Sequence, residues 1–264
     1  MCQGRKKPSV SVIMPALNEE KAVKDAIEAT LSVFREYDID GEVIVINDGS
    51  TDSTAEAVSS MINTYGPDAV KLLNHDSPKG MGASFLDGVK HAKKDTVTLN
   101  PGDNENDPSE ILRYADLIED VDVVLPFVYN KEVRSSQRNA ISFLFRSIIN
   151  VTFGTSFNYT NGTALYRRSV LSGIECRSSG FFFLAEIIIK IAKKGYLIAE
   201  VPYALSRREG GKSKAVRLRP LIRVTKDYLR LIKEIYFSKK YVSKINEFPE
   251  DSATFRRQRI GRNI

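Results

Sequence analysis

The chain has 264 residues, enough for one large α/β domain or two small ones. Hydrophobic residues make up 42% of it and charged residues 27%, a balance that is ordinary for a globular protein and excludes wholesale disorder. Cys2 and Cys176 are too few for a disulfide framework, and no Cys/His cluster offers a zinc site, so a reducing compartment is expected. There is no apolar run of the roughly 18–20 residues that span a bilayer, and residues 1–8 precede no signal-peptide core, so a cytoplasmic location is expected.

The net charge of +6 is unevenly distributed along the chain. Residues 1–130 carry 12 basic and 23 acidic side chains, whereas residues 131–264 carry 27 basic and 10 acidic ones. The excess of basic residues indicates that the second half of the chain binds an anion, which can be a phosphate, an anionic lipid headgroup or nucleic acid. Nucleic acid is not the expected partner, because the basic half contains no aromatic–basic binding module.

Short apolar, β-branched runs alternate with helical patterns in the first half. Strands are expected at residues 9–14, 42–46, 70–73, 96–99 and 121–127. Helices are expected at residues 19–36, 52–61, 82–93 and 109–118. This alternation predicts an α/β fold with a mainly parallel sheet flanked by helices. Because ligands of such sheets bind at the carboxyl ends of the strands, the polar loops 15–19, 47–52 and 101–107 are expected to converge on one rim.

The second half predicts a different set of elements, with helices at residues 137–153, 181–194 and 221–237 and strands at residues 163–167 and 196–205. The last helix has an apolar seam on one face and Arg223, Lys226, Arg230 and Lys233 on another, which is typical of a helix on an anionic membrane surface. A helix whose seam packs on the domain and whose charges are solvated has the same pattern, so both interpretations stay open. Residues 246–264 are expected to form a disordered basic tail.

Five polar segments carry candidate chemistry, and four of them also have a plain structural interpretation. PALNEE (residues 15–20) can face a ligand or cap a helix, and Asp48 can bind ribose hydroxyls or form a turn. KGMGA (residues 79–83) can turn N–H groups toward phosphate, although its spacing excludes the GxGxxG and Walker motifs. PGDNENDP (residues 101–108) offers oxygen ligands for Mg²⁺ or Mn²⁺ shared with a diphosphate, or is a solvated turn. RREGGKSK (residues 207–214) is an anion clamp or a solvated loop.

In this order the segments resemble those of family 2 glycosyltransferases, in particular the dolichol- and polyprenyl-phosphate mannose and glucose synthases. The resemblance runs from about residue 9 to residue 214 and includes PALNEE, NDGSTD, KGMGASFLDGVKHA, PGDNENDP, NYTNGTALYRRSVL, the acidic Glu186 and VPYALSRREGGKSK. It implies a GT-A fold with one domain over residues 1–245. That domain would comprise a nucleotide-sugar-binding half (1–130), an acceptor-binding half (131–215) and an amphipathic helical region (216–245).

The resemblance also implies roles for individual residues. The residues implied in donor binding are Pro15, Leu17, Glu19, Asp48, Lys79, Gly102 and Asp103. Asp103 would bind a divalent metal, Mg²⁺ or Mn²⁺, with Glu105 at a position where relatives often have a Gln ligand. The residues implied in binding the phosphates of acceptor or donor are Arg138, Arg208, Ser213 and Lys214. Asp103, Arg208 and Lys214 would carry the catalytic work.

The implied reaction moves one sugar from a nucleotide diphosphate sugar to a polyprenyl or dolichyl phosphate, with inversion, at the cytoplasmic face of a membrane. A separate membrane-anchoring partner is an option. The same fold acting on a sugar hydroxyl, in cell-surface polysaccharide assembly, is an alternative that needs a carboxylate base, for which Asp107 and Glu186 are candidates. A degenerate nucleotide-sugar binder is another, because Pro101 and Asn47 stand where the family has Asp. The chain has no Trp, which excludes the Gln-x-x-Arg-Trp motif of processive synthases.

Overall fold

A seven-stranded sheet in the order β3-β2-β1-β4-β6-β5-β7 forms the centre of the molecule. The structure is a computed structural model and describes residues 6–180, 182–205, 218–238 and 248–261. The strands are β1 (Ser9–Ala16), β2 (Asp40–Asn47), β3 (Val70–Asn74), β4 (Thr96–Leu99), β5 (Val123–Val128), β6 (Leu165–Arg167) and β7 (Ile198–Tyr203). All pairs are parallel except those of β6, which runs antiparallel to β4 and β5. The expected mainly parallel α/β sheet is confirmed.

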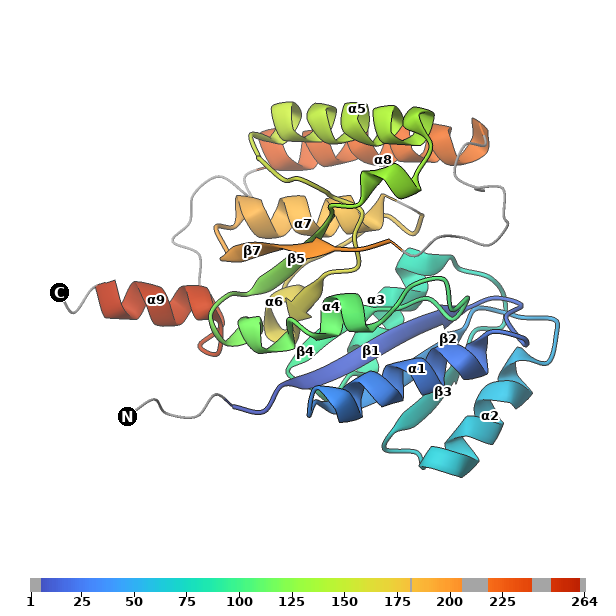
Figure 1. The fold of residues 1–264 in the computed structure, drawn as a ribbon. Helices are drawn as coiled ribbons and strands as arrows, with labels where there is room; N and C mark the ends of the chain where they lie inside the picture. The colour runs from blue at the N-terminus through green and yellow to red at the C-terminus, as the bar shows by residue number, and fades with distance from the viewer. Residues whose placement is uncertain (1–5, 181, 206–217, 239–247, 262–264) are drawn as a thin grey trace.

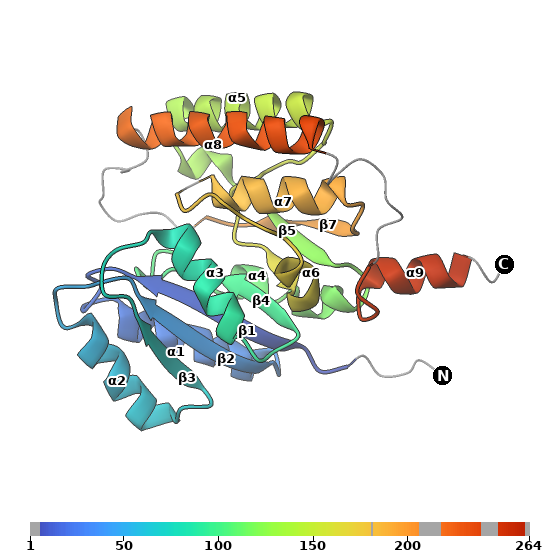
Figure 2. The same cartoon turned by 180° about the vertical axis from the view of Figure 1, so that it is seen from behind.

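Helices cover both faces of the sheet, and Figures 1 and 2 show them from opposite sides. The helices and 3-10 turns are α1 (Val23–Glu36), α2 (Thr54–Tyr65), α3 (Met81–His91), α4 (Ser109–Leu112), η1 (Ala115–Glu119), η2 (Lys131–Val133), α5 (Ser136–Phe153), α6 (Arg168–Ser172), α7 (Phe183–Lys193), α8 (Leu218–Phe237) and α9 (Ala253–Gly261). The helix expected over residues 109–118 is divided into α4 and η1. None of the helices that the structure describes is long and apolar enough to cross a membrane.

The alternating side chains of β1 enter two separate apolar cores. Val10, Val12 and Met14 pack with α1, α2 and α4 on one face of the sheet. Ile13 packs on the opposite face with α3, α6 and α7. This period of two is what a strand covered on both faces requires. A third apolar cluster lies between α5, α7 and α8, so that α5 and α8 form an outer layer over α7 (Figure 1).

The C-terminal segment is ordered, and the disordered tail predicted over residues 246–264 is wrong for residues 248–261, which include α9. Asp122, fully buried before β5, accepts hydrogen bonds from the N–H groups of Ala253 at 2.7 Å and Thr254 at 3.1 Å, and from the Thr254 hydroxyl. The rings of Phe248 and Tyr196 meet edge-on with centroids 5.0 Å apart. The basic composition of the segment does not reveal this docking, because the groups that anchor it come from elsewhere in the chain.

Candidate active site

Polar loops meet at the carboxyl ends of β1, β2 and β4, as predicted. The sequence predicted that the first strand ends before Pro15. Instead, β1 continues through Ala16, and Pro15 is paired in register with Ile46. The Gly102 N–H donates to the carbonyl oxygen of Pro15 at 3.0 Å, which joins the loop after β4 to the end of β1. A Cβ atom on the buried Gly102 would lie 3.2 Å from Cβ of Ala16, so this close approach favours glycine.

The loops after β1 and β2 bind each other through hydrogen bonds. The Asn18 N–H donates to Oγ of Ser50 at 3.0 Å, and the Thr51 N–H donates to Oδ1 of Asn18 at 2.9 Å. Asn18 has a φ of 58°, a left-handed conformation that asparagine tolerates better than most residues. The Glu19 N–H donates to the Thr54 hydroxyl at 2.9 Å, so these residues belong to the loop and α1 begins after them rather than at residue 19.

Asp48 is buried at the end of β2 and holds the backbone of the loop before α3. It is 4% exposed, and its two oxygens accept from the N–H groups of Lys79 and Gly80, each at 2.8 Å. Nδ1 of His75 also lies 2.8 Å from Oδ1 of Asp48. Burial opposes ionisation of this carboxyl, but the hydrogen bonds from His75, Lys79 and Gly80 outweigh it and keep the pKa of Asp48 below its usual value. The sequence did not predict that Asp48 holds the backbone of the loop before α3.

His75, which was not predicted from the sequence, connects Asp48 to α3. Its side chain is 6% exposed, and its Nε2 atom lies 3.3 Å from Oδ2 of Asp87 on α3. The Lys79 ammonium lies 3.6 Å from the same oxygen and is half exposed. The position of His75 directly after β3, at the edge of the sheet where Asp48 also lies, is the signal that could have identified it.

The acidic loop after β4 presents Asp103 and Glu105. Asn104 between them has a φ of 53°, and the Glu105 N–H donates to Oδ1 of Asp103 at 3.1 Å. Asp103 is half-buried and Glu105 is exposed. Within the described ranges, no group of three or more His, Cys, Asp or Glu side chains could hold a metal ion. The two carboxylates nonetheless fit Mg²⁺ or Mn²⁺, which binds proteins through one or two carboxylates and takes further oxygens from a substrate diphosphate.

A pocket opens beside the acidic loop, and Asn106 of that loop lines it. The other lining residues are Pro126, Val128, Arg134, Tyr159, Asn161, Gly162, Thr163, Tyr203 and Leu205. The Arg134 guanidinium lies over the Tyr159 ring, 5.7 Å from its centre, and donates to the Tyr159 hydroxyl at 3.4 Å. Burial and two nearby carboxylates raise the pKa of Tyr203 to about 12, so this phenol keeps its proton at neutral pH.

The pocket was not predicted, because its polar side chains come from distant parts of the sequence. Arg134 precedes α5, Tyr159 follows it, and Tyr203 ends β7. Asn158, beside Tyr159, turns to Glu200 instead, with its N–H at 2.7 Å and its side-chain amide at 2.9 Å from the two carboxylate oxygens. The stretch NYTNGTALYRRSVL was a signal for Tyr159, whereas Arg134 had only the basic charge of its half of the chain. A cation beside a phenol suits an anionic group.

The remaining predicted residues are placed in different ways. Leu17 is 43% exposed at the rim. Arg138 lies in the first turn of α5 with its side chain half-buried, and its N–H donates to the capping Ser135 hydroxyl at 3.4 Å. Three residues expected to bind phosphates lie outside the described residues: Arg208, Ser213 and Lys214.

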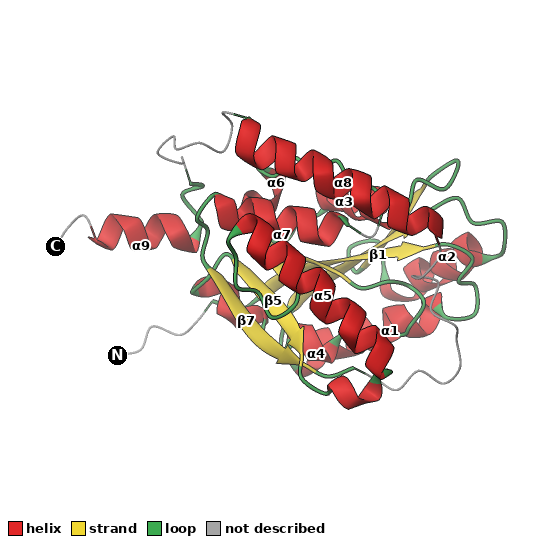
Figure 3. Cartoon of the chain, turned by 90° about the horizontal axis from the view of Figure 1, so that it is seen from above, coloured by secondary structure: helices red, strands yellow, loops and turns green. Residues whose placement is uncertain are grey.

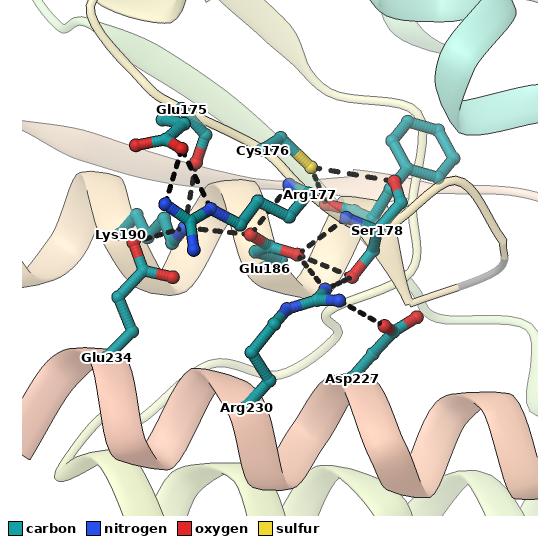
Figure 4. Close-up of polar contacts among 10 residues, drawn as sticks. Glu175, Cys176, Arg177, Ser178, Glu186, Lys190, Asp227, Arg230 and Glu234 are labelled. Atoms are coloured by element: carbon teal, nitrogen blue, oxygen red, sulfur yellow. Dashed lines mark hydrogen bonds and ion pairs between the residues drawn. The ribbon is translucent and has the colours of Figure 1, made fainter.

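Glu186, one of the two candidate bases for a sugar hydroxyl, is fully buried in a network of ion pairs (Figure 4). It accepts from the N–H groups of Arg177 and Ser178, each at 3.0 Å, and pairs with Lys190 at 2.8 Å. Burial opposes its ionisation, but these hydrogen bonds outweigh burial and hold the pKa of Glu186 below its usual value. A buried, paired carboxylate cannot take a proton from an acceptor, which leaves Asp107 as the candidate base.

The same network joins α7 to α8. Lys190 pairs with Glu234 at 2.8 Å, and Arg230 pairs with Glu186 at 3.3 Å and with Asp227 at 2.8 Å. Arg230 was expected on one basic face with Lys226, open to a membrane or to solvent, but it is paired inside this network instead. Arg230 turns toward α7 because its partner there, Glu186, is a buried carboxylate.

Comparison with known proteins gives one family and a set of relatives. A family model described as Glycosyl transferase family 2 matches residues 11–174. The chain is 26% identical over 212 residues to the low-salt glycan biosynthesis hexosyltransferase Agl6 of Haloferax volcanii, covering 77% of this chain and 49% of that protein. It is 26% identical over 208 residues to the undecaprenyl-phosphate 4-deoxy-4-formamido-L-arabinose transferase of Sodalis glossinidius, covering 78% and 62%. The chain thus spans about half to three-fifths of the length of these curated relatives.

Solved structures share the fold. Glucosyl-3-phosphoglycerate synthase from Mycobacterium tuberculosis, in complex with UDP, matches with a TM-score of 0.63 and 17% identity over 86% of this chain and 79% of that chain. The same protein with Mn²⁺, UDP and glucosyl-3-phosphoglycerate matches with a TM-score of 0.61 and 18% identity over 85% and 80%. At this level of identity the likeness establishes the fold, and it confirms the expected GT-A-type sheet.

Proposed function

Because the chain belongs to glycosyl transferase family 2, we propose that it moves one sugar from a nucleotide diphosphate sugar to a polyprenyl or dolichyl phosphate. The observation that carries this proposal is the pocket beside the acidic loop, where Arg134 lies against Tyr159 and Asn106 connects the pocket to the loop that holds Asp103. An arginine at this place suits the phosphate of the acceptor. The relative from Sodalis glossinidius, by its name, uses undecaprenyl phosphate.

The donor, GDP-mannose or a UDP-sugar, would lie across the rim of the sheet. The exposed Leu17 offers an apolar contact for the base, next to Pro15 and Glu19. The half-exposed Lys79 ammonium offers a cation for the diphosphate, in a loop whose backbone Asp48 holds. The close contact of Gly102 with the end of β1 keeps the acidic loop beside the same rim.

Asp103 and Glu105 would hold a divalent metal, Mg²⁺ or Mn²⁺, at the donor diphosphate. When bound, such an ion neutralises the charge that develops on the departing diphosphate. We assign Arg138, Arg208, Ser213 and Lys214 to the phosphates of acceptor and donor, which places the basic half of the chain against the two anionic substrates.

The proposed reaction needs no strong base. A phosphate monoester has a second pKa of about 6, so the acceptor is largely ionised at neutral pH. One of its oxygens forms a bond to the anomeric carbon from one side while the bond from that carbon to the diphosphate oxygen breaks on the other side. The configuration inverts, and the nucleoside diphosphate leaves with the bonding electron pair. The buried, paired state of Glu186 is compatible with this acceptor, whereas a sugar hydroxyl would require Asp107 as base.

The acceptor lipid resides in a bilayer, so the protein would work at the cytoplasmic face of a membrane in cell-envelope biogenesis. It would reach the leaflet by itself or through a separate anchoring partner.

The test is a transfer assay with a panel of GDP- and UDP-sugars, a short-chain polyprenyl phosphate and free sugars as acceptors, with Mg²⁺ or Mn²⁺. Mass spectrometry should detect a polyprenyl phosphate enlarged by one sugar for one of the donors. Transfer to a sugar hydroxyl alone would replace this proposal with the polysaccharide alternative. Donor binding accompanied by neither sugar transfer nor donor hydrolysis would identify a degenerate nucleotide-sugar binder.

A further inference from the structure

The outer layer of α5 and α8 exposes an unusual number of apolar side chains. In the part of the chain that the structure describes, nine of the thirteen exposed large hydrophobic residues belong to these two helices. They are Ile141, Phe143, Leu144, Ile148 and Val151 on α5 and Ile222, Leu229, Tyr236 and Phe237 on α8, with exposed fractions from 44% to 86%. We call these nine residues the outer face. Soluble proteins rarely expose large apolar side chains in such a group unless the group binds something.

Apart from Tyr236, whose hydroxyl donates to the Thr152 carbonyl oxygen of α5, the outer face is not needed to hold the two helices in place. Their inner sides already pack on α7, where Ile149 and Phe153 of α5 and Leu231 and Ile235 of α8 form one buried cluster with Phe182. The two helices lie over the same side of the molecule, as Figure 3 shows from above. The apolar seam of α8 predicted from the sequence therefore packs on the domain, and the outer face is a second apolar surface that the sequence analysis did not predict.

The charges beside the outer face are all basic among the described side chains of α5 and α8. Lys226 and Lys233 are exposed and alternate with Ile222, Leu229 and Tyr236 along one stripe of α8.

The acidic residues of these helices do not reach that stripe. Asp227 and Glu234 of α8 pair inward with Arg230 and Lys190, and α5 contains no acidic residue (Figure 4). The inward ion pairs thus leave a surface of apolar and cationic groups.

We infer that the outer face docks on an anionic lipid leaflet. Apolar side chains interleaved with lysines are the composition that binds the boundary between headgroups and acyl chains, and each lysine near an anionic surface adds attraction. A second copy of the chain is disfavoured as the occupant, because two such faces would bring lysines together without acidic partners. The inference rests on the proposed function, since a polyprenyl phosphate is reached from a leaflet.

The position of α5 relative to the pocket explains how docking on a leaflet would bring a lipid acceptor to the pocket. Arg134 lines the pocket beside the acidic loop, and α5 begins two residues later at Ser136. A protein that lies on the leaflet with its outer face down therefore brings this side of the pocket to the membrane surface. The phosphate of a lipid acceptor could then enter the pocket while its chain stays in the bilayer.

The test is co-sedimentation with phosphatidylcholine vesicles and with vesicles that also contain phosphatidylglycerol, at low and high salt. An apolar variant combines Leu144→Ser, Ile148→Ser and Val151→Ser, and a charge variant combines Lys226→Glu and Lys233→Glu. Matched controls change exposed residues elsewhere: Tyr37→Ser with Ile260→Ser for the apolar variant, and Arg257→Glu with Arg259→Glu for the charge variant.

We expect the wild type to bind the anionic vesicles, with affinity that falls in high salt, and each variant to bind at least tenfold more weakly while its control binds like the wild type. The inference is overturned if the wild type does not bind at low salt, if the variants bind like the wild type, or if each control weakens as much as its variant. Sedimentation velocity without lipid that finds a dimer in the wild type and a monomer in the apolar variant would assign the face to a second copy instead.

A second readout separates this inference from the proposed function. Turnover of a short-chain, water-soluble polyprenyl phosphate should be the same in the variants and the wild type, whereas turnover of a vesicle-embedded acceptor should fall with binding. A wild type that binds anionic vesicles but transfers to neither acceptor contradicts the proposed function and leaves the docking intact. A wild type that transfers to both acceptors without binding vesicles contradicts the docking alone.

Discussion

Nζ of Lys190 lies 2.8 Å from Oε1 of Glu186, and both side chains are fully buried where α7 faces α8. Removing one partner of a buried ion pair leaves an uncompensated charge in a low-dielectric interior. We expect Glu186→Gln to lower the free energy of unfolding by about 3 kcal/mol. Glu175→Gln, which breaks the half-exposed pair with Arg177, is the matched control and should cost less than about 1 kcal/mol. Urea unfolding measures both, and equal losses would contradict the prediction.

This stabilisation depends on pH in a known direction. The pKa of Glu186 in the folded protein lies below its ordinary value of 4.5, because hydrogen bonds outweigh the opposing effect of burial. The contribution is therefore complete above about pH 4.5 and is lost as the pH falls through the folded-state value. Acidification should narrow the stability difference between the wild type and Glu186→Gln. A difference that stays constant down to the acid transition would be inconsistent with an ionised Glu186.

Asp48→Asn should weaken donor binding without unfolding the protein. The amide nitrogen of the new side chain would face an N–H donor of Lys79 or Gly80, so the loop before α3 would lose one charge-assisted hydrogen bond. Such bonds are worth about 1.5–3 kcal/mol, and we expect UDP or GDP to bind about tenfold more weakly or worse. Calorimetric titration measures the affinity, with Asp76→Asn, an exposed carboxylate of the same loop before α3, as control. Wild-type affinity in Asp48→Asn would remove Asp48 from the donor site.

Asp103→Ala should abolish the stimulation of activity by Mg²⁺ or Mn²⁺ and leave the free energy of unfolding without metal within about 0.5 kcal/mol of the wild type. Asp103 is half-buried in a loop, so it adds little to the core. Glu105→Gln should be milder, since an amide oxygen can still bind the ion. Turnover measured against metal concentration compares the two variants. Undiminished metal stimulation in Asp103→Ala would show that the metal is held elsewhere.

Arg134→Ala should raise the KM for a polyprenyl phosphate by at least about tenfold, because a charge-assisted contact to the acceptor phosphate is lost. The affinity for the nucleotide should not change, since the pocket lies beside the donor rim rather than in it. Steady-state kinetics with a short-chain acceptor measures the first effect and calorimetry with UDP or GDP the second. Lys131→Ala, an exposed cation of η2, is the control. A loss of nucleotide affinity in Arg134→Ala would instead place Arg134 on the donor side.

Thr254→Val should lower the free energy of unfolding by about 1–2 kcal/mol, because Asp122 loses a buried hydrogen bond to the Thr254 hydroxyl while the shape of the side chain is kept. Gln258→Ala, on the exposed side of α9, should have almost no effect. Urea unfolding at neutral pH distinguishes the two. If the two variants are equally stable, the contact between the C-terminal segment and Asp122 contributes nothing.

The sequence by itself determined the elements and the rim of the candidate site. The apolar, β-branched run over residues 9–14 predicts a strand, and the structure extends it to Ala16. Loops that follow parallel strands meet at one edge of the sheet, so the convergence of the three polar loops was predicted, and the hydrogen bond from Gly102 to Pro15 is one contact within it. These features are local, because each depends on residues that are neighbours in the chain or on a general rule of sheet topology.

Only the tertiary structure decided what each polar side chain contacts. Arg230 and Lys226 look alike in the sequence of α8, but Arg230 meets the buried Glu186, 44 residues away, and Lys226 meets solvent. Residues 246–264 were predicted to be disordered because nothing in their composition indicates that Asp122, more than 130 residues earlier, would anchor Thr254. The pocket likewise needs Arg134 and Tyr203, which lie 69 residues apart in the chain. Hydrogen bonds and ion pairs act over about 3–4 Å in space whatever the distance along the chain, so a pattern along the sequence cannot specify them.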